Sequence, residues 1–167
     1  MSDSDSISQG TMANRNGKVF ENIMVPIFES NGYKVVAEKE AEKPGCVLPK
    51  KHVRKNAKFE TIYGHPGVTE FVIVNGERRI RVEAKYQSTT GSVDEKYPYM
   101  LLNAILQYPE KEIVFVVDGG GYREGAYNWL KKQIDEEFLD YKNTYGKNIK
   151  LMSIAEFMNW FNHGMKN

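Results

Sequence analysis

Hydrophobic positions near the start of the chain recur with helical spacing. Apolar residues occupy positions i, i+3, i+4 and i+7 from Phe20 to Ile27, which predicts an amphipathic helix over about 16–30. Gly32 is a suitable stop for this helix. Pro26 lies inside the same segment and should kink the helix or move its start later.

Helical spacing returns later in the chain. It is seen over 97–108, around 127–134, and after residue 153. Ser92 with Glu95 and Ser153 with Glu156 each match a capping box, so we expect helices to begin just after these serines. The first of these two helices should have about four turns.

Short β-rich runs separate the helical segments. Residues 33–37 predict a short strand, 113–117 a fully buried strand, and 149–152 another short strand. The segment 38–58 contains two prolines and a glycine, and we expect it to form a long loop. A loop of this length in a compact domain is usually functional or disordered.

Two β-rich runs flank Asn75 and Gly76, which is a strong hairpin signal. If these two residues form the whole turn, Glu70 lies opposite Arg81 and diagonal to Glu83. If the loop is two residues longer, Glu70 and Glu83 are directly opposed. Alternation gives the same faces in both cases: one holds Phe71, Ile73, Ile80, Val82 and Ala84, and the other holds Glu70, Arg79, Arg81, Glu83 and Lys85.

The two glutamates of this hairpin could share a cation. Opposed or diagonal Cβ atoms lie within about 4.5–8 Å of each other, which is close enough for two carboxylates to bind one metal ion. The single cysteine and three scattered histidines argue against a structural zinc site. Any metal should therefore be bound by oxygen, and Mg²⁺, with Mn²⁺ as a substitute, fits such ligands.

The charge of the chain is unevenly distributed. The net charge is +1, but 41–58 hold six basic residues against one acidic residue, so this segment carries +5 and the remainder −4. The segment either contacts a polyanion or is a solvated loop. If it lies along a DNA backbone, the contacts should come from Lys50, Lys51, Arg54 and Lys55.

Length and composition indicate one globular domain. The chain has 167 residues, which suits a single core. Residues 1–13 are polar and predict a disordered tail or a remnant of expression, leaving 14–167 as the domain. No apolar run is long enough to cross a bilayer, and the start lacks the order of a signal peptide, so we expect a cytoplasmic protein of a bacterial or phage-host cell.

The order helix, three strands, helix, strand gives an α/β domain with a mixed sheet flanked by helices. This αβββαβ order and the spacing of its acidic residues resemble the PD-(D/E)XK nuclease superfamily, in its restriction-endonuclease-like and resolvase-like forms. The resemblance covers residues 16–134. The matching residues are Glu21 in the first helix, Glu70 on one hairpin strand, Glu83, Ala84 and Lys85 on the next, Gln87, and the stretch from Gly91 through Ser92 to Lys96.

This resemblance implies a Mg²⁺-dependent endonuclease that hydrolyses phosphodiester bonds in double-stranded DNA. Glu70, Glu83 and the carbonyl of Ala84 would bind the metal, and Lys85 would orient the attacking water or stabilise the phosphorane. Glu21 and Gln87 would support catalysis. Ser92 and Lys96 would contact DNA, and a homodimer on DNA would cut both strands.

Two features depart from the family pattern. The usual Asp is Glu70 here, and Thr69 stands where a proline is common, so Glu60 is the substitute ligand if Glu70 is not one. Two other functions stay open: a structure-specific resolvase acting on junctions, and a catalytically silent DNA-binding module.

Overall fold

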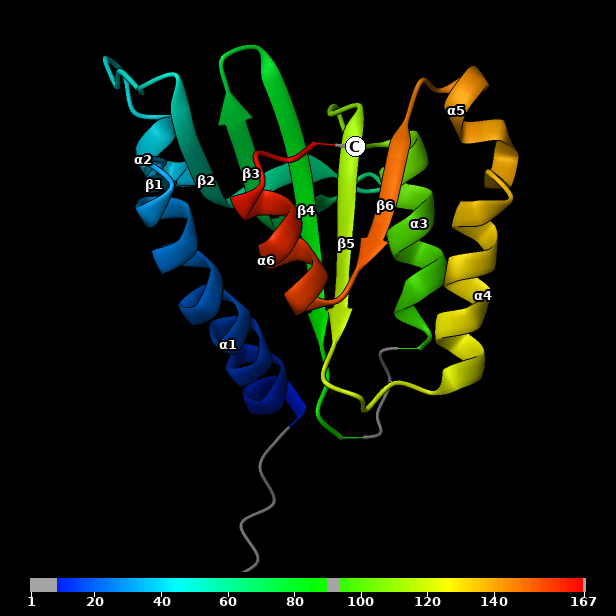
Figure 1. Ribbon diagram of the computed structural model, residues 1–167. Coiled ribbons are helices and arrows are strands. Elements are labelled where there is room, and N and C mark those ends of the chain that lie inside the picture. Colours follow the sequence, from blue (N-terminus) through cyan, green and yellow to red (C-terminus); the bar gives the residue numbers. More distant parts are fainter. Residues whose placement is uncertain (1–8, 90–93, 167) are drawn as a thin grey trace, which may run out of the picture.

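The computed structural model describes residues 9–89 and 94–166 as an α/β domain with one mixed sheet (Figure 1). The strands are β1 (Lys34–Ala37), β2 (Lys51–Glu60), β3 (Pro66–Asn75), β4 (Arg78–Tyr86), β5 (Glu112–Asp118) and β6 (Asn148–Met152). The helices are α1 (Gln9–Ser30), α2 (Glu38–Ala41), α3 (Lys96–Leu106), α4 (Glu124–Asp135), α5 (Tyr141–Thr144) and α6 (Ile154–Asn162), with a 3₁₀ turn at Phe138–Asp140.

The six strands follow one another in sequence order across the sheet. β1 runs parallel to β2, β3 runs antiparallel to both β2 and β4, and β4, β5 and β6 run parallel to one another. Helices α1 and α6 cover one face, and α3 and α4 cover the other (Figure 1). This arrangement confirms the expected fold class and buries β5 between helices on both faces.

The first helix begins earlier than the sequence suggested. α1 starts at Gln9, so the expectation of a tail over 1–13 is corrected for residues 9–13. Pro26 lies within this helix and does not end it. Among the described residues, no helix is both long and apolar enough to cross a membrane.

The prediction of one long loop over 38–58 was wrong, because only residues 42–50 lie outside helices and strands. The segment contains α2 and most of β2, a ten-residue strand. Val53 and Ala57 are buried on this strand, but long charged side chains stand between and beside them. Charged residues usually mark an exposed surface, whereas here they lie on an edge region of the sheet whose apolar positions are few.

The β3–β4 hairpin adopts the register expected for the longer of the two loops considered. Val74 pairs with Arg79 and Asn75 with Arg78, so the turn consists of Gly76 and Glu77. Gly76 has φ +64°, a conformation that glycine adopts without steric cost.

Three further predictions concern α3, β5 and α6. β5 is buried as expected, and α6 begins with the predicted capping box of Ser153 and Glu156. α3 has Glu95 as its N-cap with no side-chain hydrogen bond, so it starts later than the box at Ser92 implied. Ser92 itself lies outside the described residues.

A glycine loop after β5 fixes the end of β4. The Gly121 amide donates to the carbonyl of Gln87 at 2.7 Å, and the Gln87 amide donates to the carbonyl of Asp118 at 2.9 Å. The Asp118 carboxylate in turn accepts the amide of Ile154 at 2.8 Å, at the start of α6. This loop therefore ties β4, β5 and α6 together at the C-terminal end of β4.

Gly119 in this loop should tolerate no side chain. A Cβ there would lie 2.3 Å from the carbonyl oxygen of Gln87, and its φ is +101°. We expect Gly119→Ala to lower the free energy of unfolding by about 2–4 kcal/mol, through overpacking and backbone strain. Gly120→Ala is the matched control, because its Cβ would meet nothing within 4 Å. Urea denaturation giving equal losses for the two variants would contradict the packing argument.

Candidate active site

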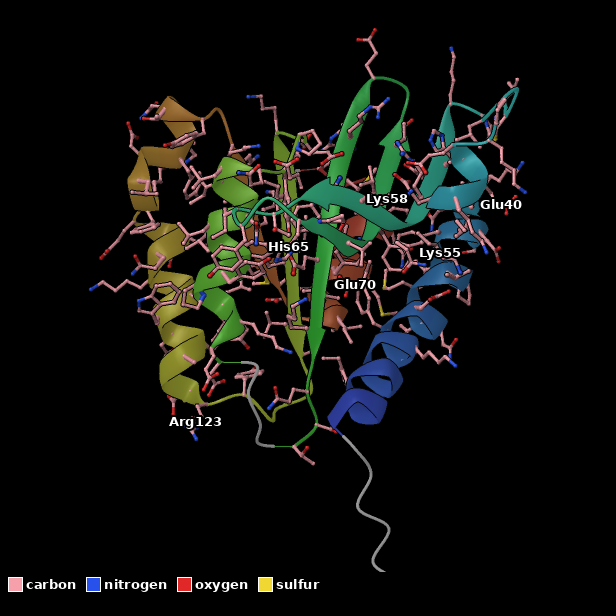
Figure 2. All side chains as sticks on the ribbon, turned by 180° about the vertical axis from the view of Figure 1, so that it is seen from behind. Glu40, Lys55, Lys58, His65, Glu70 and Arg123 are labelled. Atoms are coloured by element: carbon pink, nitrogen blue, oxygen red, sulfur yellow. The ribbon has the colours of Figure 1, made fainter. Side chains whose placement is uncertain are left out.

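The acidic pair of the hairpin lies where the β3–β4 ladder ends. Pairing is seen as far as Phe71 with Val82, and beyond that point β4 continues alongside β5 only. One step further in the same register, Glu70 is level with Glu83. Oε2 of Glu70 accepts the backbone amide of Ala84 at 2.7 Å, so a carboxylate takes the place of a strand carbonyl. Figure 2 shows Glu70 between α1 and α3, in a view from behind the sheet.

The strand opposite Glu70 is also irregular. The register of β2 with β3 places Asn56 level with Glu70, and Asn56 has φ +55°. Non-glycine residues seldom adopt this left-handed conformation. The backbone of β2 is therefore distorted next to the point where the β3–β4 ladder opens.

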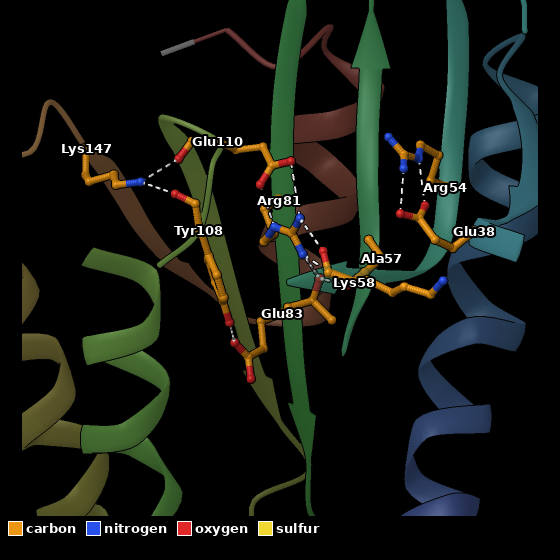
Figure 3. Close-up of polar contacts among 10 residues, drawn as sticks. Glu38, Arg54, Ala57, Lys58, Arg81, Glu83, Tyr108, Glu110 and Lys147 are labelled. Carbon is orange, nitrogen blue, oxygen red and sulfur yellow. Dashed lines mark hydrogen bonds and ion pairs between the residues drawn. The ribbon is translucent and has the colours of Figure 1, made fainter. Parts of the chain in front are cut away.

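Glu83 is buried and contacts two polar side chains. Its Oε1 lies 2.9 Å from Nζ of Lys85, two residues along the same strand. Its Oε2 accepts the hydroxyl of Tyr108, which follows α3 (Figure 3). Glu83 is 8% exposed, so these contacts replace the hydrogen bonds to water that its carboxylate loses on burial. Glu83 and Lys85 thus lie on one face, as alternation predicted.

Burial and mutual charge shift the pKa values of this cluster. Burial raises the pKa of Glu70, and the Glu83 charge adds to the rise, although Lys85 opposes it. Burial alone would lower the pKa of Lys85, but Glu83 and Glu70 outweigh it and raise that pKa above its ordinary range. Burial and the Glu83 charge also raise the pKa of Tyr108. At neutral pH Lys85 is therefore protonated, and the hydroxyl of Tyr108 keeps its proton and donates a hydrogen bond.

Gln87 is buried near this cluster but is anchored elsewhere. Its Nε2 donates to the carbonyls of Thr89 at 2.7 Å and Gly121 at 3.3 Å. Its Oε1 is buried and has no hydrogen-bond partner within the described chain. The hydroxyl of Tyr97, on the α3 side of Lys85, is a second such atom. Gln87 therefore holds the strand end, and among the described residues no hydrogen bond joins its side chain to the Glu70 or Glu83 carboxylate.

Two other acidic candidates lie away from the pair. Glu21 on α1 forms an ion pair with Lys55 of β2. Glu60 is exposed at the end of β2, opposite Pro66. Within the described ranges, neither contacts the Glu70, Glu83 and Lys85 cluster through a hydrogen bond or ion pair.

The residues expected to contact DNA are spread over different environments. Arg54 forms a double ion pair with Glu38, at 2.5 and 2.6 Å, and Lys55 pairs with Glu21. Lys50 is exposed, and Nζ of Lys51 lies 5.5 Å from the centre of the Tyr33 ring. Lys96 is exposed at the start of α3, and Ser92 falls in the part of the chain that is not described.

Most of the positive charge of 41–58 is offset locally. Besides Arg54 and Lys55, Lys43 pairs with Glu40 and Lys58 with Glu42. Three of the four glutamates involved lie on α2 or directly after it, outside or at the edge of the segment counted from sequence. The expectation of a freely available +5 surface is therefore corrected.

A buried polar network next to the acidic pair was not predicted. Arg81 is 2% exposed, and its guanidinium binds the carboxylate of Glu110 at 2.5 and 3.3 Å. It also donates to Thr69 Oγ1 at 2.9 Å and to the carbonyl of Ala57 at 3.1 Å. Its Cζ lies 5.0 Å from the Tyr108 ring centre, which joins the network to the partner of Glu83 (Figure 3).

The donor set suits a hard divalent cation. Glu70 and Glu83 supply carboxylate oxygens, which Mg²⁺ prefers over nitrogen or sulfur. The Ala84 amide points toward Glu70, and in a strand the carbonyl of the same residue points to the same edge, so the Ala84 carbonyl lies on that side too. No group of three or more His, Cys, Asp or Glu forms a metal site among the residues described, so this pair would need backbone and water oxygens.

The site thus consists of an acidic pair and a lysine on two adjacent strands of a mixed α/β sheet. A family model for the PD-(D/E)XK nuclease superfamily domain matches residues 12–165. The chain therefore belongs to the PD-(D/E)XK nuclease superfamily. Nucleases of this superfamily generally use divalent metal ions. Neither the curated proteins nor the solved structures contain a match.

The raised pKa of Glu70 has a consequence for stability without metal. The folded state holds the Glu70 proton more tightly than the unfolded chain does, so stability falls as pH rises above the ordinary value of 4.5. Glu70→Gln should therefore raise the melting temperature at neutral pH in chelator, and the gain should vanish well below pH 4.5. Calorimetric melting of both proteins checks this.

Glu77→Gln is the matched control, since Glu77 is exposed in the β3–β4 turn. It should change the melting temperature little at either pH. A lower melting temperature for Glu70→Gln at neutral pH would show that the ionised carboxylate stabilises the fold.

Proposed function

We propose that the protein is a Mg²⁺-dependent endonuclease that hydrolyses phosphodiester bonds in double-stranded DNA, with Mn²⁺ as a substitute ion. The observation that supports this most is the convergence of Glu70, Glu83 and Lys85 at the opening of the β3–β4 ladder in a chain of this superfamily. Two acids and a protonated lysine, beside the part of β4 that has no β3 partner, are the groups that phosphodiester hydrolysis needs.

The protein groups have distinct parts in this proposal. A bound divalent ion would lower the pKa of a water and neutralise developing charge on the phosphate. Glu70 and Glu83 would hold that ion, together with the Ala84 carbonyl. Lys85 stays protonated, so it would act as a point charge on the phosphorane or orient the water, and would not serve as a general base.

Double-stranded DNA and a homodimer are the partners we propose. One active site cuts one strand at a time, so a double-strand break needs two copies or two successive events. With a weak dimer, nicked circles should accumulate before linear product. A four-way junction remains the alternative substrate, and it is tested beside the plain duplex.

The test is cleavage of supercoiled plasmid, linear duplex and a four-way junction by the purified protein. Cleavage should occur with Mg²⁺ or Mn²⁺ and stop with EDTA, and Ca²⁺ should bind without supporting it. Lys85→Ala and Glu83→Ala should each lower the rate by about 100-fold or more. Equal rates in EDTA, or full activity of Lys85→Ala, would reject the proposal. Arg123→Ala is the control, because it removes an exposed charge at the N-cap of α4.

Tyr108 should act as a positioning residue for Glu83. Tyr108→Phe removes the hydroxyl that Glu83 accepts, so the carboxylate loses a fixed orientation. We expect the cleavage rate, or the affinity for Mg²⁺, to fall by about 10–100-fold, as is usual for groups that orient metal ligands. Titration calorimetry with Ca²⁺ measures the affinity without turnover.

Tyr141→Phe is the matched control for this variant. Tyr141 is equally buried, and its hydroxyl donates to the carbonyl of Ile134 at 2.9 Å, away from the acidic pair. Both variants should lose about 1 kcal/mol of folding free energy. If Tyr141→Phe lowers cation affinity as much as Tyr108→Phe, the positioning role is wrong.

A further inference from the structure

One part of the sheet face that carries Glu83 is covered mainly by charged side chains, one of them Glu38 of α2. Ala57, Val72 and Val74 form a small buried cluster there, separate from the two main cores. Arg54 and Arg81 are the cross-strand neighbours of Val72, and Arg79 is the neighbour of Val74. The aliphatic stems of long basic residues can cover such apolar positions while their charged ends remain outside.

A cavity of about 200 Å³ lies over this cluster. Its charged lining consists of four cations and two carboxylates: Arg54, Lys58, Arg79, Arg81, Glu38 and Glu110. Pro109 and the apolar residues Val72 and Ala57 complete it. Cations outnumber acids in a recess on the active-site face of the sheet.

Both carboxylates of the cavity are already paired. Glu38 binds Arg54, and Glu110 binds Arg81, each through two hydrogen bonds (Figure 3). Lys58 pairs with Glu42 at the surface. Within the described ranges, Arg79 has no carboxylate partner, so its charge is available to an anion in the cavity. A guanidinium can bind two oxygens of a phosphate with its planar fork.

The cavity and the acidic pair share one strand face. Arg79, Arg81, Glu83 and Lys85 alternate along β4 and point to the same side. Glu83 lies four positions after Arg79, which is about 13 Å along an extended strand. Arg81 links the two places, since its guanidinium lines the cavity and lies against the ring of Tyr108, the partner of Glu83.

We propose that this cavity is a subsite for a backbone phosphate of the nucleic acid whose scissile phosphate lies at Glu70 and Glu83. The inference rests on the proposed function and names Arg79 as the main donor, a residue outside the basic segment first considered. The distance along β4 separates this phosphate from the point of cleavage by about 13 Å. A negatively charged polymer satisfies both places at once, which a single small anion would not do.

The test measures duplex binding in Ca²⁺ as a function of salt, by fluorescence anisotropy of a labelled duplex. Loss of one phosphate contact should lower the slope of log affinity against log salt by about 0.9 in Arg79→Ala. Arg79→Lys should restore the slope, because the charge returns. Lys132→Ala, an equal loss of charge on α4 outside the cavity, should leave the slope unchanged.

Two results would overturn the proposal. One is an Arg79→Ala slope equal to that of Lys132→Ala in a protein that still cleaves DNA, which rejects the subsite and leaves the nuclease function standing. The other is the finding that inorganic phosphate binds the wild type and that duplex does not displace it. That result would assign the cavity to a free anion. A wild type that neither binds nor cuts duplex rejects the proposed DNA-cleaving function, and the subsite with it.

Discussion

The position of β4 between two unlike neighbours is the constraint on which the site depends. β4 is antiparallel to β3 through Val82 and then continues parallel to β5 as far as Tyr86. Where β3 leaves, the Ala84 amide loses its strand partner, and a buried amide without a partner is costly. The carboxylate of Glu70 accepts it. The end of the β3–β4 ladder therefore holds one of the two acids in place.

Burying so many charges on this face requires that each be paired. Arg81 and Glu110 are both nearly inaccessible, and removing one partner of such a pair typically costs about 3–5 kcal/mol. The pair contributes little net stability compared with apolar residues of similar size. Its value is positional, because Arg81 fixes the carbonyls of β2 and the ring of Tyr108 at once. Tyr108 and Lys85 then restrict the orientation of the Glu83 carboxylate, each through one of its two oxygens.

Alternation along the hairpin was sufficient to place Glu70, Glu83 and Lys85 on one face, because a two-residue period leaves no other arrangement. The sequence did not determine the register, because Asn75 and Gly76 suit turns of two different lengths. Only contacts made elsewhere in the sheet distinguish the two registers. The strand β2 was missed because charged residues dominate it. Its few apolar positions can be identified as buried only when β3 is known to lie beside it in the fold.

Contacts between distant segments had no sequence signal at all. Tyr108 fits the apolar spacing of α3, and nothing local shows that its hydroxyl reaches Glu83, 25 residues earlier. Arg81 and Glu110 are separated by 29 residues and by a whole helix. Glu21 shows the opposite limitation. Its place in the first helix suits the family pattern, whereas the side chain pairs with Lys55 instead.

Local pairing also changes how the charge of the molecule should act on DNA. A cluster of +5 would attract a polyanion over about one Debye length, roughly 8–10 Å at ordinary ionic strength. With Arg54 and Lys55 each held by a glutamate, that long-range field is largely cancelled. In the proposed complex with DNA, attraction would then come mainly from short-range contacts. Such contacts would favour a DNA structure that fits the face of β4 over rapid capture of any duplex.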